Sequence, residues 1–161
     1  MSTSWRTAWQ GQDIVIYRDD TELDRVSAPQ IERVIFVYAG NGESAGDLQH
    51  AVVETHEHCF IFPAETGFAG RVNFERVDYW AERGCVYWVA QSQAPLPLRV
   101  RRGRWWRLSG PAFARLPRAE LAAMIDHWPL EGPQTWEQRK WRRIERSRPF
   151  AKHEDSHRAR A

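Results

Sequence analysis

The chain has 161 residues, of which 42% are hydrophobic and 27% are charged, as expected for one globular domain rather than for a disordered chain. It contains no apolar run near the roughly 20 residues that a membrane-spanning helix needs, and the first residues lack the apolar core of a signal peptide. The two cysteines, Cys59 and Cys85, form no CxxC pair, which predicts a cytosolic chain with free, buried thiols.

Five or six short strands are predicted in residues 1–63, mostly at hairpin spacing, so we expect a mainly antiparallel sheet or a small barrel. The segment Ile31–Ala39 is almost continuously apolar towards its end, which predicts that both of its faces are covered. A helix is the alternative for Leu48–Glu54. The predicted strands are Trp5–Gln10, Asp13–Arg18, Arg25–Ala28, Ile31–Ala39, Leu48–Glu54 and Cys59–Pro63.

A central helix is predicted at about residues 67–83, with Thr66 as its N-cap and Gly84 as its stop. Phe68, Val72 and Tyr79 would lie along its apolar side. The apolar residues between positions 72 and 79 also approximate strand alternation with one slipped residue, so a bulged strand is the alternative. A short buried strand, Cys85–Ala90, is expected to follow.

The C-terminal part is predicted to be helical after a stiff connector at residues 94–97 and a hairpin over Leu98–Leu108. Leu116–Trp128 has Pro117 in its first turn, and Gln134–Arg148 lies between two prolines. The sequence therefore predicts one α+β domain over residues 1–149, sheet-rich in 1–108 and helical in 116–148. Residues 150–161 are expected to be a disordered polar tail.

Charge is unevenly distributed along the chain. Residues 1–65 contain 4 basic and 11 acidic residues, a net charge of −7, whereas residues 99–148 contain 13 basic and 5 acidic residues, a net charge of +8. Either the basic half binds an acidic partner, or the two halves face each other in the fold.

Two basic stretches interleave arginine with tryptophan. Guanidinium groups neutralise phosphates, and exposed indoles stack on unpaired bases or lie at a membrane surface, so nucleic acid and anionic lipid are candidate partners. The alternative is that Trp136, Trp141 and Ile144 dock on the sheet and the basic residues are the solvated side of that helix. The candidate binding residues are Arg101, Arg102, Arg104, Trp105, Trp106, Arg139, Lys140, Trp141, Arg142 and Arg143.

The segment Gly42–Gly46 matches G-x-S-x-G and follows a strand, which makes Ser44 a candidate nucleophile. A nucleophile elbow needs a strand-to-helix turn and a base, here Asp126 or His127. An exposed loop rich in Gly, Asn and Ser is the alternative reading of the same residues.

His56 and His58 would share a face if both lay on one strand, as two zinc ligands could, with His50 or Cys59 as a third ligand. A turn at residues 55–58 would scatter them, and no CxxC or HExxH motif supports a metal site. No cofactor is predicted.

These features favour a non-enzymatic cytosolic protein that binds another protein through its Trp/Arg-rich C-terminal surface. A nucleic-acid-binding protein using the same surface is one alternative. A small hydrolase that uses Ser44 or a histidine-bound metal is the other.

Overall fold

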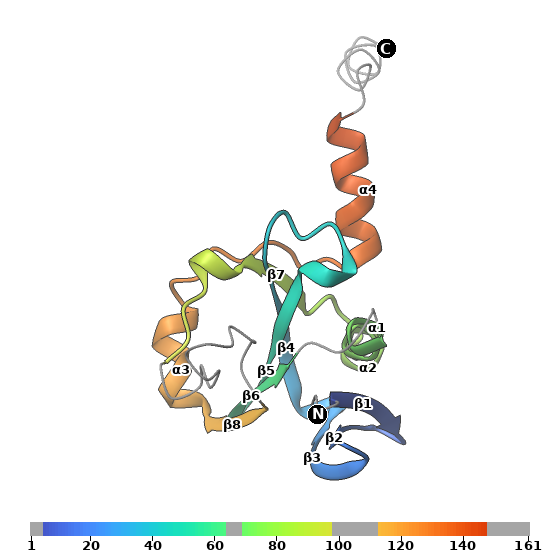
Figure 1. Ribbon diagram of the computed structural model, residues 1–161, viewed down its shortest axis with the longest axis vertical. Helices are drawn as coiled ribbons and strands as arrows, with labels where there is room; N and C mark the ends of the chain where they lie inside the picture. The colour runs from blue at the N-terminus through green and yellow to red at the C-terminus, as the bar shows by residue number, and fades with distance from the viewer. Residues whose placement is uncertain (1–4, 64–68, 98–112, 148–161) are drawn as a thin grey trace.

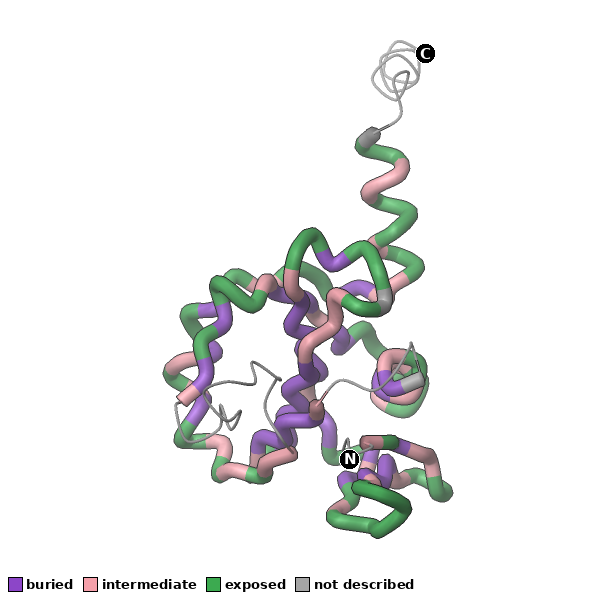
Figure 2. The backbone as a smooth tube through the Cα atoms, viewed as in Figure 1, coloured by how far each residue is buried: buried purple, intermediate pink, exposed green. Residues whose placement is uncertain are grey.

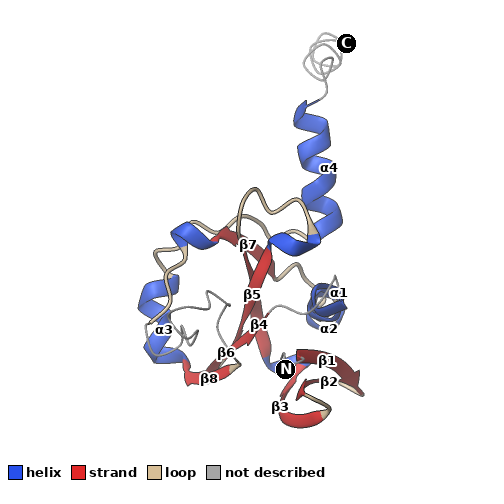
Figure 3. Cartoon of the chain, viewed as in Figure 1, coloured by secondary structure: helices blue, strands red, loops and turns tan. Residues whose placement is uncertain are grey.

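The computed structural model describes residues 5–63, 69–97 and 113–147, which form an α+β fold with two sheets (Figures 1 and 3). The first sheet is an antiparallel meander, β1–β2–β3, made of Trp5–Gln10, Asp13–Arg18 and Thr21–Ser27. Its two turns are short because Gly11, Asp19 and Asp20 adopt positive φ, the backbone geometry that tight hairpin turns require. The first two strands have the predicted bounds. The third begins four residues earlier than predicted.

The second sheet has five strands in the order β7-β4-β5-β6-β8. Among the described strands, only β4 and β7 pair in parallel, so the predicted mainly antiparallel arrangement is confirmed. These strands form an open sheet rather than a closed barrel. The strand β8 was not predicted. The bounds are Ile31–Tyr38 for β4, Leu48–Thr55 for β5, His58–Pro63 for β6, Val86–Ala90 for β7 and Ala114–Pro117 for β8.

Four α-helices and three short 3-10 helices complete the described chain. The two predicted C-terminal helices are present and slightly shorter than expected. The α-helices are α1 (Ala69–Glu75), α2 (Val77–Ala81), α3 (Arg118–Ile125) and α4 (Trp136–Ser147), and the 3-10 helices are η1 (Ala28–Gln30), η2 (Ala45–Asp47) and η3 (Gln91–Gln93).

Both faces of the five-stranded sheet are covered, as predicted from the apolar run in β4. Along β4, Val34 and Phe36 face one side, and Ile35 and Val37 face the other. The first side packs against the meander, α1 and α2, and the second against α3 and residues 94–96. The central strands are accordingly the most deeply buried part of the trace (Figure 2).

Residues 94–97 are part of the core, which corrects the prediction that they end the compact portion. Ala94 and Leu96 are buried among the residues of the second side, with Leu121 and Ile125 of α3. Pro95, between them, is exposed. The alternation of apolar residues and prolines therefore places Ala94 and Leu96 against the sheet while Pro95 faces solvent.

The predicted central helix is present but broken at Arg76, and its predicted apolar side is wrong. Val72 and Tyr79 are 47% and 80% exposed, whereas Phe74 and Val77 are buried. The chain leaves α2 through Glu82, which adopts the left-handed conformation (φ 53°) assigned to Gly84 by the sequence. Gly84 instead packs closely on Pro133, since a Cβ there would lie 3.1 Å from Pro133 Cβ, a tight contact that the proline would have to relieve.

Candidate functional site

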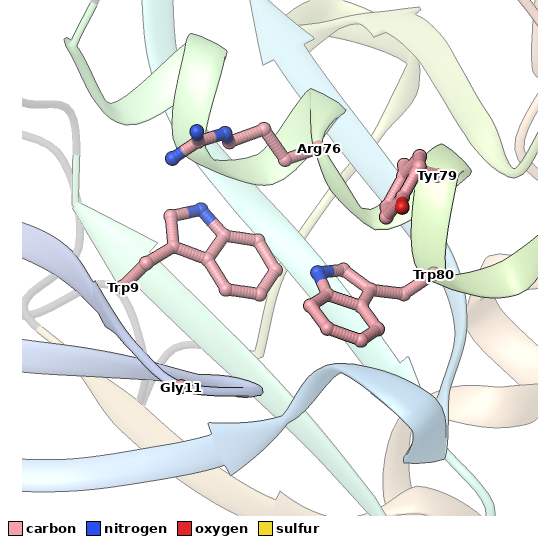
Figure 4. A pocket seen from close by; sticks show the side chains of 5 residues that line it. All are labelled: Trp9, Gly11, Arg76, Tyr79 and Trp80. Carbon is pink, nitrogen blue, oxygen red and sulfur yellow. The ribbon is translucent and has the colours of Figure 1, made fainter.

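Three aromatic side chains and one arginine gather where the turn between β1 and β2 meets α1 and α2 (Figure 4). Trp9, Arg76, Tyr79 and Trp80, which we call the aromatic patch, line a pocket of about 410 Å³ with Gly11 at its rim. The ring planes of Trp9 and Trp80 lie within 24° of each other with their centroids 6.3 Å apart. The Tyr79 ring meets that of Trp80 at 82°, with centroids 5.7 Å apart.

The inner side of α2 is held tightly, which forces its aromatic residues outwards. Val77 is fully buried, and Ala81, four residues later, packs against the same core. Between them, Asp78 Oδ1 accepts hydrogen bonds from Cys85 N (2.9 Å) and Cys85 Sγ (3.1 Å). Because the inner positions of this short helix are taken, Tyr79 and Trp80 remain exposed.

Trp9 is fixed by contacts between the meander and α1. Its Nε1 donates to Asn73 O at 3.0 Å. In return, Asn73 Nδ2 donates to the backbone oxygen and the hydroxyl of Thr7, at 3.0 and 2.9 Å. The indole is therefore oriented before any ligand arrives, which lowers the entropic cost of binding.

The free polar groups of the aromatic patch are hydrogen-bond donors. Arg76 is exposed and forms no ion pair within the described part of the chain. The Nε1 of Trp80 and the hydroxyl of Tyr79 have no hydrogen-bond partner there either. Among the described residues, no carboxylate or amide side chain lines the pocket. The site is thus suited to a ligand that presents apolar surface and hydrogen-bond acceptors.

The sequence analysis missed this site because it placed Tyr79 on the apolar side of the predicted helix and assigned no role to Trp80. The available signal was the spacing of Phe74, Val77 and Ala81, which places a different side of α1 and α2 against the sheet. Trp9 could not be assigned to the site from sequence, because its contact with α1 spans 64 positions.

The helix α4, which carries half of the predicted binding residues, projects from the body of the fold (Figure 1). Trp136 in its first turn is partly buried and packs on Trp88, with ring centroids 5.8 Å apart. Trp141 is 55% exposed. The predicted docking of this helix on the sheet therefore holds for Trp136 and is wrong for Trp141.

Arg139 faces the body of the fold rather than solvent, with a side chain only 13% exposed. Its guanidinium lies 4.7 Å from the ring centroid of Tyr38 and donates to Gly42 O (2.7 Å) and Asn41 O (3.1 Å). Burial and a hydrogen bond to Glu131 raise the pKa of Tyr38. Arg139 therefore anchors α4 to the loop between β4 and β5.

The other predicted cations of α4 differ in how they are engaged. Arg142 donates to Gln134 Oε1 at 2.8 Å, and Arg143 lies 3.2 Å from Glu43 Oε1. Lys140 is exposed and has no ion pair within the described residues. The first basic stretch, Arg101, Arg102, Arg104, Trp105 and Trp106, lies outside the described residues, so its role stays a prediction.

The loop that contains Ser44 connects two antiparallel strands, β4 and β5. Asp47 Oδ2 accepts hydrogen bonds from the backbone N–H groups of Glu43 (3.0 Å) and Ser44 (3.2 Å), which closes the loop on itself. A nucleophile elbow requires a strand followed by a helix. The strand–loop–strand geometry found here does not provide it.

The histidine cluster is scattered. His56 lies in the turn between β5 and β6 and is 89% exposed, with Nδ1 3.7 Å from Glu32 Oε1. His58 begins β6, so the expectation that both histidines share a strand face is wrong. Within residues 5–63, 69–97 and 113–147, no three His, Cys, Asp or Glu side chains lie together as metal ligands would.

Both cysteines are free and buried, as predicted. Burial raises the pKa of Cys59 to about 11. Burial and the hydrogen bond to Asp78 raise the pKa of Cys85 to about 12. Both thiols therefore stay protonated near neutral pH and are poor nucleophiles.

His50 is the most isolated buried polar side chain of the second sheet. It is 3% exposed, and neither ring nitrogen has a hydrogen-bond partner among the residues that the structure describes. Burial lowers its pKa from 6.5 to about 4. The imidazole is therefore neutral in the folded protein over the physiological pH range.

This isolation predicts an acid-sensitive fold. Between pH 6.5 and about 4 the unfolded chain binds a proton at His50 that the folded chain does not, so stability falls as the pH is lowered. At about pH 4 the loss from this residue should reach about 3 kcal/mol. His50→Leu should remove it. Urea unfolding of both proteins near pH 7 and pH 4 measures the difference, and equal pH dependence of the two would contradict the prediction.

No protein-family model, curated protein or solved structure matched this chain. Among the described helices, none is both long and apolar enough to cross a bilayer. The function is therefore argued from the geometry of the aromatic patch.

Proposed function

We propose that this chain is a non-enzymatic binding module that contacts a partner protein through the aromatic patch. The observation that carries the proposal is the exposure of Tyr79 (80%) and Trp80 (37%) beside Arg76. Tyrosine, tryptophan and arginine are the residues most enriched at the energetic centres of protein interfaces. Each aromatic ring offers a large apolar area that association removes from water.

The proposed contact surface differs from the C-terminal one that the sequence favoured. On α4, Arg139 and Arg143 already contact the body of the fold, through the loop at residues 41–43. In the aromatic patch, the outward-facing groups of Arg76, Tyr79 and Trp80 remain available. We propose a cytoplasmic location as well, because both cysteines are free and buried, as in proteins of reducing compartments.

The proposal predicts that capture of a partner depends on the aromatic patch. Full-length protein immobilised on beads, and the variants Tyr79→Ala and Trp80→Ala, would be exposed to a lysate of the source cells and the retained proteins quantified by mass spectrometry. Removal of either ring should reduce retention of the specific partner about tenfold or more, the loss typical of a central aromatic contact.

Trp141→Ala is the matched control, since it removes another exposed indole, 55% exposed, outside the aromatic patch. Partners that depend on Trp80 should be retained by this variant. A set of captured proteins identical for the parent, Tyr79→Ala and Trp80→Ala would refute the proposed function.

Nucleic-acid binding through α4 is the second candidate, favoured by the exposure of Trp141 beside Lys140. Binding to phosphates weakens steeply as salt is raised, because counterions released from the nucleic acid drive it. Loss of a salt-sensitive interaction in Trp141→Ala, with Trp80→Ala unaffected, would move the function to this helix.

A further inference from the structure

We propose that the aromatic patch binds a neutral, proline-rich segment of its partner in the polyproline II conformation. This inference rests on the proposed function and names the chemistry of the occupant. Three features of the site support it: the arrangement of the aromatic rings, the hydrogen-bond donors around them and the charge of the lining residues.

Trp80 lies between Trp9 and Tyr79, and Tyr79 is set off to one side of the line through the two indoles (Figure 4). The ring centroids of Trp9 and Trp80 are 6.3 Å apart, and those of Trp80 and Tyr79 are 5.7 Å apart. A polyproline II helix rises about 3.1 Å per residue, so about two residues would lie over the two indoles. Because Tyr79 stands nearly perpendicular to Trp80, it forms a wall against which a pyrrolidine ring can pack.

The donors of the aromatic patch complement a proline-rich backbone. Each proline has a carbonyl oxygen but no N–H, so such a segment presents acceptors and few donors. The aromatic patch has the opposite character, since the guanidinium of Arg76 and Nε1 of Trp80 are donors without a partner in the part of the chain that the structure describes. A ligand in an extended strand would bring backbone N–H groups, and no carboxylate or amide side chain among the described lining residues accepts from them.

Charge argues against a polyanion at this site. Arg76 is the single cation among the described residues that line the pocket. The exposed carboxylate of Glu82 follows two residues after Trp80. Single-stranded nucleic acid is held by several cations along its backbone as well as by stacking on aromatic rings. A neutral peptide fits one guanidinium better.

Binding of such a segment also costs little conformational entropy. A polyproline II helix is largely formed before it binds, so it loses little conformational entropy on docking. The indole of Trp9 is itself fixed by its hydrogen bond to Asn73. Two prearranged surfaces can therefore associate through a small contact area.

The test is fluorescence anisotropy of a labelled peptide of about ten prolines titrated with the full-length protein. A glycine–serine peptide of the same length and a thymidine oligonucleotide are the comparison ligands. We expect saturable binding of the proline peptide, weakened about tenfold or more by Tyr79→Ala and by Trp80→Ala and unchanged in Trp141→Ala. Tyr79 is 80% exposed, so its removal leaves the fold intact and keeps the test valid if Trp80→Ala proves unstable.

The inference is overturned if the proline peptide does not bind at about 1 mM protein. Equal binding of the glycine–serine peptide, or proline-peptide binding that survives loss of Tyr79 and Trp80, overturns it as well. Binding of the oligonucleotide in place of the proline peptide would assign the rings to base stacking. If partner capture depends on Trp80 but the proline peptide does not bind, this inference alone is refuted and the proposed function is retained.

Discussion

Trp88→Ala is expected to lower the free energy of unfolding by about 3–5 kcal/mol, the cost of deleting a large buried aromatic side chain. Trp88 is fully buried in β7 and contacts Phe36, with ring centroids 4.8 Å apart. Its Nε1 donates to Gln134 O at 2.8 Å, just before α4 begins. The variant loses this hydrogen bond and leaves a cavity at the base of α4.

Chemical denaturation monitored by far-ultraviolet circular dichroism would measure this loss. Tyr79→Ala provides the comparison, because truncation of an 80% exposed ring should change stability by less than about 0.5 kcal/mol. A loss below about 1 kcal/mol in Trp88→Ala would mean that Trp88 is not packed as described.

The strands could be predicted from sequence because their signals are local. β1, β2 and β4 consist of β-branched and aromatic residues, bounded by residues that favour turns. The strand β8 escaped prediction because its four residues, Ala114–Pro117, have no such pattern. Pairing with β6, more than fifty positions earlier, makes this segment a strand.

The orientation of α1 and α2 was predicted wrongly because two apolar patterns compete in this segment. Val72 and Tyr79 define one side of a helix, whereas Phe74, Val77 and Ala81 follow the i, i+3, i+7 spacing of another side. The second set packs against the core, so Tyr79 and Trp80 face solvent. The candidate site therefore lies on a side of α2 that the sequence analysis had turned towards the core.

The charge asymmetry had two predicted explanations, and ion pairs support the internal one. Arg118 pairs with Glu32, and Arg115 lies 3.4 Å from Asp24. Arg143 lies 3.2 Å from Glu43. Each pair joins the basic C-terminal part to the acidic N-terminal part. These three pairs neutralise part of the asymmetry within the fold.

Glu54→Ala is expected to destabilise the protein by about 3–5 kcal/mol, because it leaves a partly buried cation without its counterion. Glu54 is 2% exposed and accepts a hydrogen bond from Arg33 Nε, whose side chain is 29% exposed. This hydrogen bond is the main cause of the raised pKa of Arg33. Arg33 also lies 5.8 Å from the ring centroid of Tyr87, so the unpaired guanidinium would remain against an apolar face.

The double variant Arg33→Met/Glu54→Leu distinguishes two free energies. One is the destabilisation caused by an unpaired Arg33, and the other is the net contribution of the Arg33–Glu54 ion pair to stability. Removal of both charges should recover most of the stability lost in Glu54→Ala, because well-packed apolar side chains replace buried ion pairs at little cost. Urea denaturation of Arg33→Met, Glu54→Leu and the double variant completes the cycle. If the double variant is as unstable as Glu54→Ala, the loss comes from packing around β4 and β5 rather than from the unpaired charge.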